Sequence, residues 1–400
     1  MNKQKIESLL ESVDIRLNGS RPWDIQVRDE RMYGKLMAHG SLGLGEAYMD
    51  GWWDAAALDQ FFCRILRSGL ERNYAITPRA ILDYLGALFA NLQNPSRAYA
   101  NIKHHYDIGN DLYKAMLDKR MVYTGAYWNG ARNLDEAQQT KLEMVCRKLD
   151  LRQGQRILDI GCGWGSFAKY AAENYGVNVV GITISREQVE LGKELCKGLP
   201  VEIRLQDYRE LNEKFDHIVS LGMIEHVGYK NYKTYFEIVS RSLSDNGIFL
   251  LQTIGGNISM RSSDPWLNKY IFPNSMLPSI KQIAQAIESR FVMEDWHNFG
   301  THYDKTLMAW FQNFDGRWDS LKNNYSDRFY RMWKYYLLSC AGAFRSRKVQ
   351  LWQIALSKNG LEEGFNALRH GAESKKRNLD PGEVLSDFVK IKRPLLTDFR

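Results

Sequence analysis

A glycine-rich turn, Asp159-Ile-Gly161-Cys-Gly163-Trp-Gly165, is the clearest chemical signal in the sequence. A short β-prone run at residues 156–160 precedes it, and a helical pattern at residues 167–175 follows it. Glycine is needed where a backbone turns sharply and a ligand approaches it closely. Because the strand–turn–helix context is the one that such a motif requires, the sequence predicts a nucleotide-type site at this turn.

Two ligands compete for such a turn, a dinucleotide pyrophosphate and S-adenosylmethionine (AdoMet). The GxGxG spacing with Asp159 before it resembles motif I of the class I methyltransferases, which favours AdoMet. The carboxylate that usually ends the second strand and binds ribose is missing, and Thr183 and Gln188 stand there as neutral side chains. Asp207, after the third strand, is suited to the adenine amino group, with a simple strand-end cap as the alternative.

Strand and helix patterns alternate around this turn. Strands are expected at residues 156–160, 177–184, 201–205, 215–221, 248–253 and 349–356, and helices at 167–175, 185–197, 229–243 and 328–344. This alternation predicts an α/β fold with a parallel, doubly wound sheet.

The N-terminal part has a different, helical pattern. Asp54 is predicted to cap a helix with an apolar face between Leu58 and Leu70, and a second helix is expected at residues 79–92. Asn94-Pro95-Ser96 is the predicted boundary, because proline cannot continue a helix. We therefore expect a small helical domain at 1–95, a catalytic domain at 96–360 and a polar tail at 361–400.

Composition excludes several classes of protein. The 400 residues are 44% hydrophobic and 25% charged, which is typical of globular domains, and no apolar run approaches the roughly 18 residues that span a bilayer. The N-terminus lacks a signal-peptide core, and five scattered cysteines without a CxxC pair indicate a reducing cytoplasm and no zinc site. The net charge of +7 and 49 aromatic residues point to an anionic partner, either nucleic acid or a phospholipid surface.

Seven motifs in order resemble the cyclopropane-fatty-acyl-phospholipid synthases, the bacterial type with its own N-terminal domain. The likeness runs from about Ser41 to about Leu356. The motifs are Ser41-Leu-Gly-Leu-Gly-Glu-Ala-Tyr-Met-Asp-Gly-Trp-Trp53, His105-Tyr-Asp-Ile-Gly-Asn-Asp-Leu-Tyr113, Ile157-Leu-Asp-Ile-Gly-Cys-Gly-Trp-Gly165, Glu225-His-Val-Gly228, Asn268-Lys-Tyr-Ile-Phe-Pro-Asn274, Met293-Glu-Asp-Trp-His-Asn-Phe-Gly300 and Ala341-Gly-Ala-Phe-Arg345.

This resemblance implies an enzyme that transfers a methylene group from AdoMet to cis double bonds of acyl chains in membrane phospholipids. It also implies a homodimer that works in the cytoplasm, attached peripherally to the inner membrane face. Beside Asp159, Gly163 and Gly165 of the turn, the residues carried over to the AdoMet site are Tyr123, Thr124, Gly161, Thr183, Gln188 and Asp207.

The chemistry of such a reaction explains why aromatic residues matter. An isolated alkene is a weak nucleophile, so its attack on a sulfonium methyl depends on alignment and exclusion of water. The attack leaves a carbocation, which water would trap and which aromatic faces stabilise without reacting. Candidates for this role, each of which is otherwise a core residue, are Tyr123, Tyr127, Trp128, Tyr270, Phe272, Tyr303 and Trp310.

The resemblance further implies that a bound bicarbonate acts as the base for ring closure, held by a Glu, a His, a Tyr and backbone amides. Glu225, Tyr303 and Ile254 match this pattern, but Gly125 replaces a Cys and Gln252 replaces the His. Gln252 can donate a hydrogen bond, yet it can neither carry charge nor shuttle a proton. A paralogue that stops at a methyl-branched or methylene product is therefore an alternative.

Other functions have weaker support. A small-molecule N-methyltransferase and a lipid-binding pseudoenzyme are the remaining alternatives, and no recognition region for nucleic acid is evident. His104-His105 and Glu225-His226 lack metal-ligand spacing, so no metal is expected. Trp52-Trp53 beside arginines suits an anionic bilayer surface, and packing of the neighbouring apolar helix face inside the protein is the equal alternative. Residues 255–280 resemble a lid or substrate loop.

Overall fold

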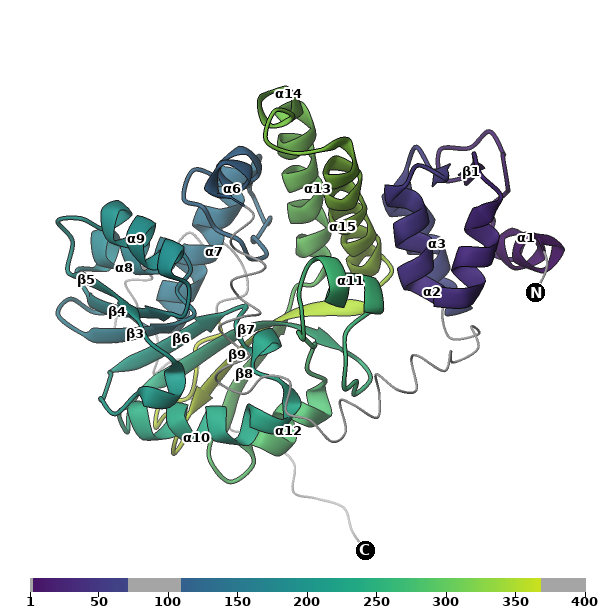
Figure 1. Ribbon diagram of the computed structural model, residues 1–400. Coiled ribbons are helices and arrows are strands. Elements are labelled where there is room, and N and C mark those ends of the chain that lie inside the picture. The colour runs from purple at the N-terminus through teal and green to yellow at the C-terminus, as the bar shows by residue number, and fades with distance from the viewer. Residues whose placement is uncertain (1–2, 71–108, 368–400) are drawn as a thin grey trace, which may run out of the picture.

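A seven-stranded sheet forms the centre of the computed structural model, which describes residues 3–70 and 109–367 (Figure 1). The strand order is β5-β4-β3-β6-β7-β9-β8. The strands are β3 (Arg156–Ile160), β4 (Asn178–Thr183), β5 (Val201–Leu205), β6 (His217–Leu221), β7 (Ile248–Gly256), β8 (Val292–Asn298) and β9 (Val349–Ser357). All six predicted strands are present, with ends that differ from the predicted ones by a few residues.

The sheet is only partly parallel. Strands β3 to β7 pair in parallel, whereas β9 runs antiparallel to both β7 and β8. The doubly wound α/β prediction is confirmed, but an all-parallel sheet is wrong at this edge, and β8 was not predicted. This edge strand carries Glu294, Asp295 and His297 in seven residues, so its composition does not have the β-branched character that marks a buried strand.

Helices cover both faces of the sheet. Helices α7 (Leu134–Lys148) and α8 (Ser166–Tyr175) pack on one face, against side chains such as Ile157 of β3. Helices α10 (Tyr232–Ser242) and α12 (Ile280–Ile287) pack on the other face, against the alternate residues such as Leu158. Successive strand residues point to opposite faces, so each buried strand contributes to both cores. Helix α9 (Arg186–Leu195) follows its N-cap residue Ser185, whose side chain accepts a hydrogen bond from the Gln188 N–H.

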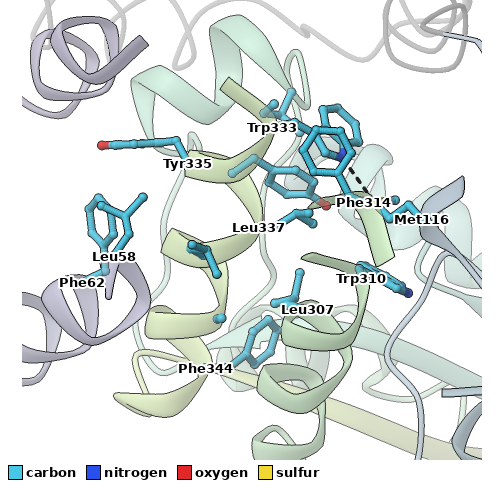
Figure 2. Close-up of a cluster of buried hydrophobic side chains, with 14 of the residues drawn as sticks. Leu58, Phe62, Met116, Leu307, Trp310, Phe314, Trp333, Tyr335, Leu337 and Phe344 are labelled. Atoms are coloured by element: carbon cyan, nitrogen blue, oxygen red, sulfur yellow. Dashed lines mark hydrogen bonds between the residues drawn. The ribbon is translucent and has the colours of Figure 1, made fainter. Parts of the chain in front are cut away.

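The N-terminal helices share one hydrophobic core with the helices above the sheet. Figure 2 shows helix α15 (Asp327–Arg345) between α3 (Leu58–Ser68) and α13 (Thr301–Gly316). Leu58, Phe61 and Phe62 of α3 are buried, and the Phe62 ring lies 5.1 Å from the Tyr335 ring of α15. The apolar face of α3 is thus occupied by protein. The other described elements of this upper layer are α1 (Lys3–Glu11), α2 (Arg31–Met49), β1 (Gln26–Val27), β2 (Trp53–Asp54), α6 (Asn110–Met116), α11 (Pro265–Tyr270) and α14 (Trp318–Leu321).

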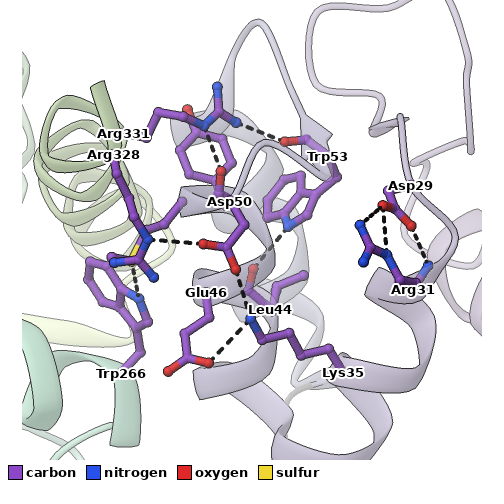
Figure 3. Close-up of polar contacts among 12 residues, drawn as sticks. Asp29, Arg31, Lys35, Leu44, Glu46, Asp50, Trp53, Trp266, Arg328 and Arg331 are labelled. Carbon is purple, nitrogen blue, oxygen red and sulfur yellow. Dashed lines mark hydrogen bonds and ion pairs between the residues drawn. The ribbon is translucent and has the colours of Figure 1, made fainter. Parts of the chain in front are cut away.

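Hydrogen bonds and ion pairs connect α2 and β2 to α15 (Figure 3). Arg331 of α15 donates to the carbonyls of Tyr48 and Trp53 and forms an ion pair with Asp54 at 3.0 Å. Arg328 forms an ion pair with Asp50, also at 3.0 Å. Asp54 therefore belongs to β2, and the prediction that it caps the next helix is wrong, because α3 begins only at Leu58. The residues around Asp54 in the sequence do not predict its ion pair with Arg331, because the two residues lie far apart in the chain.

The tryptophan pair predicted to face a bilayer is largely used inside the protein. Trp53 is fully buried, and its indole N–H donates to the Leu44 carbonyl at 2.9 Å. Trp52 is half-buried, with the charged groups of Arg31 and Lys35 within 4.7 Å of its ring centre. Trp53 thus packs inside the protein, whereas Trp52 is only partly covered. The predicted helix at residues 79–92 and the boundary at residues 94–96 lie outside the described residues, as does the tail beyond residue 367.

Gly342→Ala tests the contact between α3 and α15. A Cβ atom at Gly342 would lie 2.6 Å from the Asp59 carbonyl oxygen and 2.8 Å from the Phe62 Cβ, so this substitution must push the helices apart. We expect a loss of about 1–3 kcal/mol, measured as a lower urea midpoint. Gly316→Ala is the matched control, since a Cβ there meets no atom within 4 Å. Equal midpoints for both variants would contradict this packing.

Candidate active site

The predicted strand–turn–helix unit is present between β3 and α8. Gly161, Gly163 and Gly165 have φ values of 77°, 56° and 81°, a region that favours glycine. A Cβ at Gly161 would also lie 2.8 Å from the Met223 side chain. The backbone N–H groups of residues 161 and 162 donate to the Ile182 carbonyl of β4, which fixes the turn against the neighbouring strand.

Two adjacent pockets share Gly161. Gly165 lines neither pocket and instead precedes α8, where a Cβ would lie 3.0 Å from the Cys196 sulfur. The other predicted AdoMet residues divide between the pockets. The first is lined by Tyr123, Thr124, Asp159, Gly163 and Gln188, and the second by Thr183 and Asp207.

Neutral side chains replace the expected ribose carboxylate at the end of β4. The Thr183 hydroxyl donates to the Gln188 Oε1 at 2.7 Å, and both residues are buried. Asp207 accepts from the Arg209 backbone N–H at 2.9 Å and pairs with its guanidinium at 2.8 Å. Asp207 thus acts as a strand-end cap that lies in the pocket wall, and adenine recognition by its carboxylate stays a prediction.

A buried lysine was missed by the sequence analysis. Lys141 of α7 lines the first pocket, is fully buried, and donates to the Thr124 hydroxyl at 3.1 Å. Burial lowers the pKa of Lys141 to about 8, and burial raises the pKa of Asp159, in the same pocket wall, to about 7. AdoMet ends in an amino acid with one carboxylate and one ammonium, so we expect Lys141 and Asp159 to hold these two groups. The sequence signal for Lys141 was the presence of polar residues at positions 138, 141 and 148, on the side of this helix that faces the core.

Glu225 is the buried acid of the site. It lies on a single 3-10 turn (Ile224–His226) after β6, and its Oε1 accepts from the Ile254 backbone N–H of β7 at 2.8 Å. Its Oε2 is buried and has no hydrogen-bond partner among the described residues. Burial raises the pKa of Glu225 to about 7. The Ile254 backbone thus holds one carboxyl oxygen of Glu225, a contact that was not predicted, and the second oxygen is left unpaired among the described residues.

Gln252 lies two residues before Ile254 on the same face of β7. Gln353, its register partner on β9, donates to the Gln252 Oε1 at 2.9 Å, and both side chains are buried. The Gln252 Nε2 has no partner within the part of the chain that the structure describes. Gln353 thus contacts the oxygen end of the Gln252 amide, and the Gln252 Nε2 and the Gln353 Oε1 both stay unpaired among the described residues. Sequence reasoning missed Gln353, because the β7–β9 register is not encoded locally.

Gly125 brings the loop before α7 against Tyr303, which lies in the first turn of α13. A Cβ at Gly125 would be 2.5 Å from Leu351 and 2.9 Å from the Tyr303 ring. The Tyr303 ring lies 4.6 Å from the Phe344 ring and 5.8 Å from the Trp310 ring. The missing side chain therefore lets the backbone lie directly on this aromatic group.

Only some of the aromatic residues predicted to stabilise a carbocation lie next to one another. Tyr123 contacts the Trp310 ring at 5.2 Å and shares a hydrogen bond with the Tyr336 hydroxyl at 2.9 Å, and Phe272 lies 5.6 Å from the Tyr336 ring. Tyr336, which was not predicted, therefore joins these side chains. Three candidates have contacts with other residues: Tyr127 packs on His302, Trp128 donates to Thr306, and Tyr270 donates to Glu46.

Comparison with known proteins identifies the family. The family described as mycolic acid cyclopropane synthetase matches residues 93–354. The chain belongs to the cyclopropane synthase family. It is 55% identical to the cyclopropane-fatty-acyl-phospholipid synthase of Escherichia coli K12, covering 90% of this chain and 94% of that protein, and 36% identical to a probable fatty acid methyltransferase of Pseudomonas putida, covering 84% and 86%.

The fold is that of class I AdoMet-dependent methyltransferases, as predicted. The mycolic acid cyclopropane synthase CmaA1, solved with S-adenosylhomocysteine, superimposes with a TM-score of 0.61 at 30% identity, covering 65% of this chain and 98% of that one. Family membership makes this protein an AdoMet-dependent methyltransferase. Among the described residues, no group of His, Cys, Asp or Glu side chains could hold a metal ion.

The Glu225 carboxyl predicts a pH-dependent stability. A folded pKa of about 7 against an ordinary 4.5 means that the folded protein holds this proton more tightly than the unfolded chain does. The contribution of Glu225 to the free energy of unfolding is therefore fully present below about pH 4.5. It falls as the pH rises towards 7, by up to about 1.4 kcal/mol per pH unit. Urea unfolding of Glu225→Gln should lack this share of the decline. An unchanged slope between pH 5 and 7 would contradict the buried, protonated acid.

Lys141→Met tests recognition of the amino-acid end of AdoMet. A hydrogen bond to a charged group contributes about 1.5–3 kcal/mol, so S-adenosylhomocysteine should bind about 10- to 100-fold more weakly by calorimetry. Binding of 5′-methylthioadenosine, which lacks the amino-acid end, should be unchanged. Lys148→Met is the matched control, because Lys148 is equally buried on the same helix but contacts His297 and Asp295. Equal weakening for both ligands would count against this role of Lys141.

Proposed function

We propose that this protein transfers a methylene group from AdoMet to cis double bonds of unsaturated acyl chains in membrane phospholipids and so forms cyclopropane rings. The observation that carries the proposal is a buried acid, Glu225, with one oxygen left unpaired among the described residues, just after the β6 strand of the central sheet. The high identity to a cyclopropane-fatty-acyl-phospholipid synthase over most of both chains supports the same reaction.

Buried aromatic residues support a reaction that must be protected from water. AdoMet supplies an electrophilic methyl group when it is bound. An alkene attacks such a methyl only when the two are held in line, and the resulting positive charge on the chain must not meet water. The buried rings of Tyr303, Trp310 and Phe344 form an apolar boundary whose faces stabilise positive charge without adding to it.

Two unpaired polar groups support a bicarbonate site. Gln252 Nε2 and Glu225 Oε2 are both buried without partners among the described residues, and burying such atoms costs free energy unless a ligand satisfies them. With its pKa near 7, Glu225 is able to donate a proton to a hydrogen bond, and Gln252 donates from its amide. Bicarbonate, when bound, supplies the base that ring closure requires. These residues, together with Tyr303, are the ones that we propose hold it.

Gln252 also favours a second candidate product. A neutral amide in place of a His cannot take up a proton, so Gln252 gives no help to proton loss from the added methyl group. If a bound bicarbonate took the proton from a neighbouring carbon of the chain instead, a methyl-branched or methylene chain that keeps a double bond would result. The Pseudomonas putida relative, a probable fatty acid methyltransferase, carries a name that fits such a product. The single difference between the two candidates is whether the added carbon closes a ring.

We further propose that the protein works as a homodimer attached to an anionic bilayer on its cytoplasmic face, with no nucleic acid as partner. A double bond lies within the hydrocarbon layer, so an enzyme that reacts with it must contact the bilayer surface. The net charge of +7 supports an anionic surface. Within residues 3–70 and 109–367, no helix combines the length and apolar character needed to cross a membrane.

Product analysis tests this function. The protein is incubated with vesicles of an unsaturated phosphatidylglycerol and AdoMet, with bicarbonate present or stripped, and the fatty acids are analysed by gas chromatography and mass spectrometry. We expect a gain of one CH₂ with loss of the double bond, and a drop of at least about 100-fold in Glu225→Gln, because loss of a positioned acid–base group has effects of this size. Gln252→His is expected to raise turnover when bicarbonate is scarce.

Each other outcome identifies a different function. A methyl-branched product that keeps an unsaturated bond would establish the branching candidate. Methyl transfer to small amines but not to vesicles would indicate an N-methyltransferase. AdoMet binding without any turnover would indicate a lipid-binding pseudoenzyme.

A further inference from the structure

Three large apolar side chains are exposed on the loop after β7 and at the start of α12. Ile258, Met260 and Ile280 are 54%, 55% and 52% exposed, and they are half of the six large hydrophobic residues that are exposed in the described part of the chain. Single exposed apolar residues are common on protein surfaces, but several in one place usually mark a binding surface. We call these three residues the lid patch.

Hydrogen bonds hold the lid patch in one place. The Ser259 and Ser279 hydroxyls bond to each other at 2.7 Å, which ties the loop after β7 to the first turn of α12. The Gln282 amide donates to the Met260 carbonyl at 3.1 Å and also completes a capping box with Ser279. Ile258, Met260 and Ile280 therefore flank residues that are bonded to one another, so the exposed side chains belong to one local unit.

The lid patch lies at the edge of the sheet that carries the site. It follows Gly256, the last residue of β7, whose preceding residues Gln252 and Ile254 belong to the site. Two other exposed apolar residues, Val292 and Met293, begin β8. Val292 and the first residue of β7 both pair with Ser357 of β9, so this second pair lies at the opposite edge.

Basic side chains stand beside the lid patch. Arg261 follows Met260 and Lys281 follows Ile280, and both are exposed. Apolar residues flanked by Arg and Lys suit a bilayer with anionic headgroups, where the apolar groups enter the interface and the cations meet phosphate. A stable protein interface buries roughly 800 Å² on each partner, which three side chains do not provide.

We infer that the lid patch, rather than the N-terminal tryptophan pair, is the surface through which the protein docks onto an anionic phospholipid bilayer. The inference rests on the proposed function, because it places the site's edge of the sheet against the layer that contains the acyl chains. Ile258, Met260 and Ile280 enter the interface, while Arg261 and Lys281 meet the headgroups. Trp53 and the apolar face of α3 stay inside the protein.

A matched pair of double variants tests this docking surface. Ile258→Ser with Met260→Ser removes a β-branched side chain and a methionine from the patch, and Val292→Ser with Met293→Ser removes a comparable pair from the opposite edge. Co-sedimentation with phosphatidylglycerol vesicles should be at least about tenfold weaker for the first variant and unchanged for the second. Both variants should bind S-adenosylhomocysteine as the parent does, which shows that they are folded.

Two further measurements separate the possible failures. The patch variant should lose turnover on vesicles but keep it on a detergent-dispersed unsaturated phospholipid, whereas failure of the proposed function would abolish both activities in the parent protein. Equal vesicle binding by both variants would overturn the inference. A change from dimer to monomer in the patch variant by analytical ultracentrifugation, with vesicle binding retained, would also overturn it and assign the patch to a second copy of the chain.

Discussion

The hydrogen bond from the Ile254 N–H to the Glu225 carboxyl places a buried acid at the end of strand β7, in surroundings from which water is excluded. Removing water raises the pKa of this acid to about 7 and leaves its second oxygen to be satisfied by a ligand. The same exclusion is what a carbocation requires. The layer of helices above the sheet therefore shields this end of β7 from water.

Helix α15 is central to that layer. It packs against α13 on one side and against the N-terminal helix α3 on the other, and it supplies Tyr336 and Phe344 to the aromatic groups near the site. Arg331 on the same helix binds backbone carbonyls of the N-terminal segment. Packing of the N-terminal helices and enclosure of the site thus share one element, and much of the high aromatic content serves both purposes.

The two departures from the family pattern have different structural consequences. Gly125 is buried against Tyr303 and Leu351 so closely that its lack of a side chain is part of the local packing. Gln252 is instead part of a buried pair with Gln353, whose amide donates to the Gln252 Oε1. A hydrogen-bond donor is thereby retained where the family pattern has a His, while the capacity to carry a proton is not.

Local signals determined much of this protein from sequence alone. The glycine turn, the Ser185 cap and the strands of the parallel part are set by residues close to one another in the chain, because positive φ angles, caps and alternating burial are local properties. The ordered motifs likewise identified the family and the positions of Glu225, Ile254 and Tyr303. The amino-acid sequence therefore places these features to within a few residues.

The tertiary structure alone decided features that depend on distant pairings. The antiparallel β9, the edge strand β8 and the Gln252–Gln353 pair follow from register, which no single segment specifies. Whether the apolar face of α3 meets lipid or protein depended on α15, which lies near the other end of the chain. A pattern of residue types indicates which surface is buried away from water, and only the folded structure shows what covers that surface. Trp53 proved to be covered by protein and Trp52 to be half-covered, and the lid patch is left exposed.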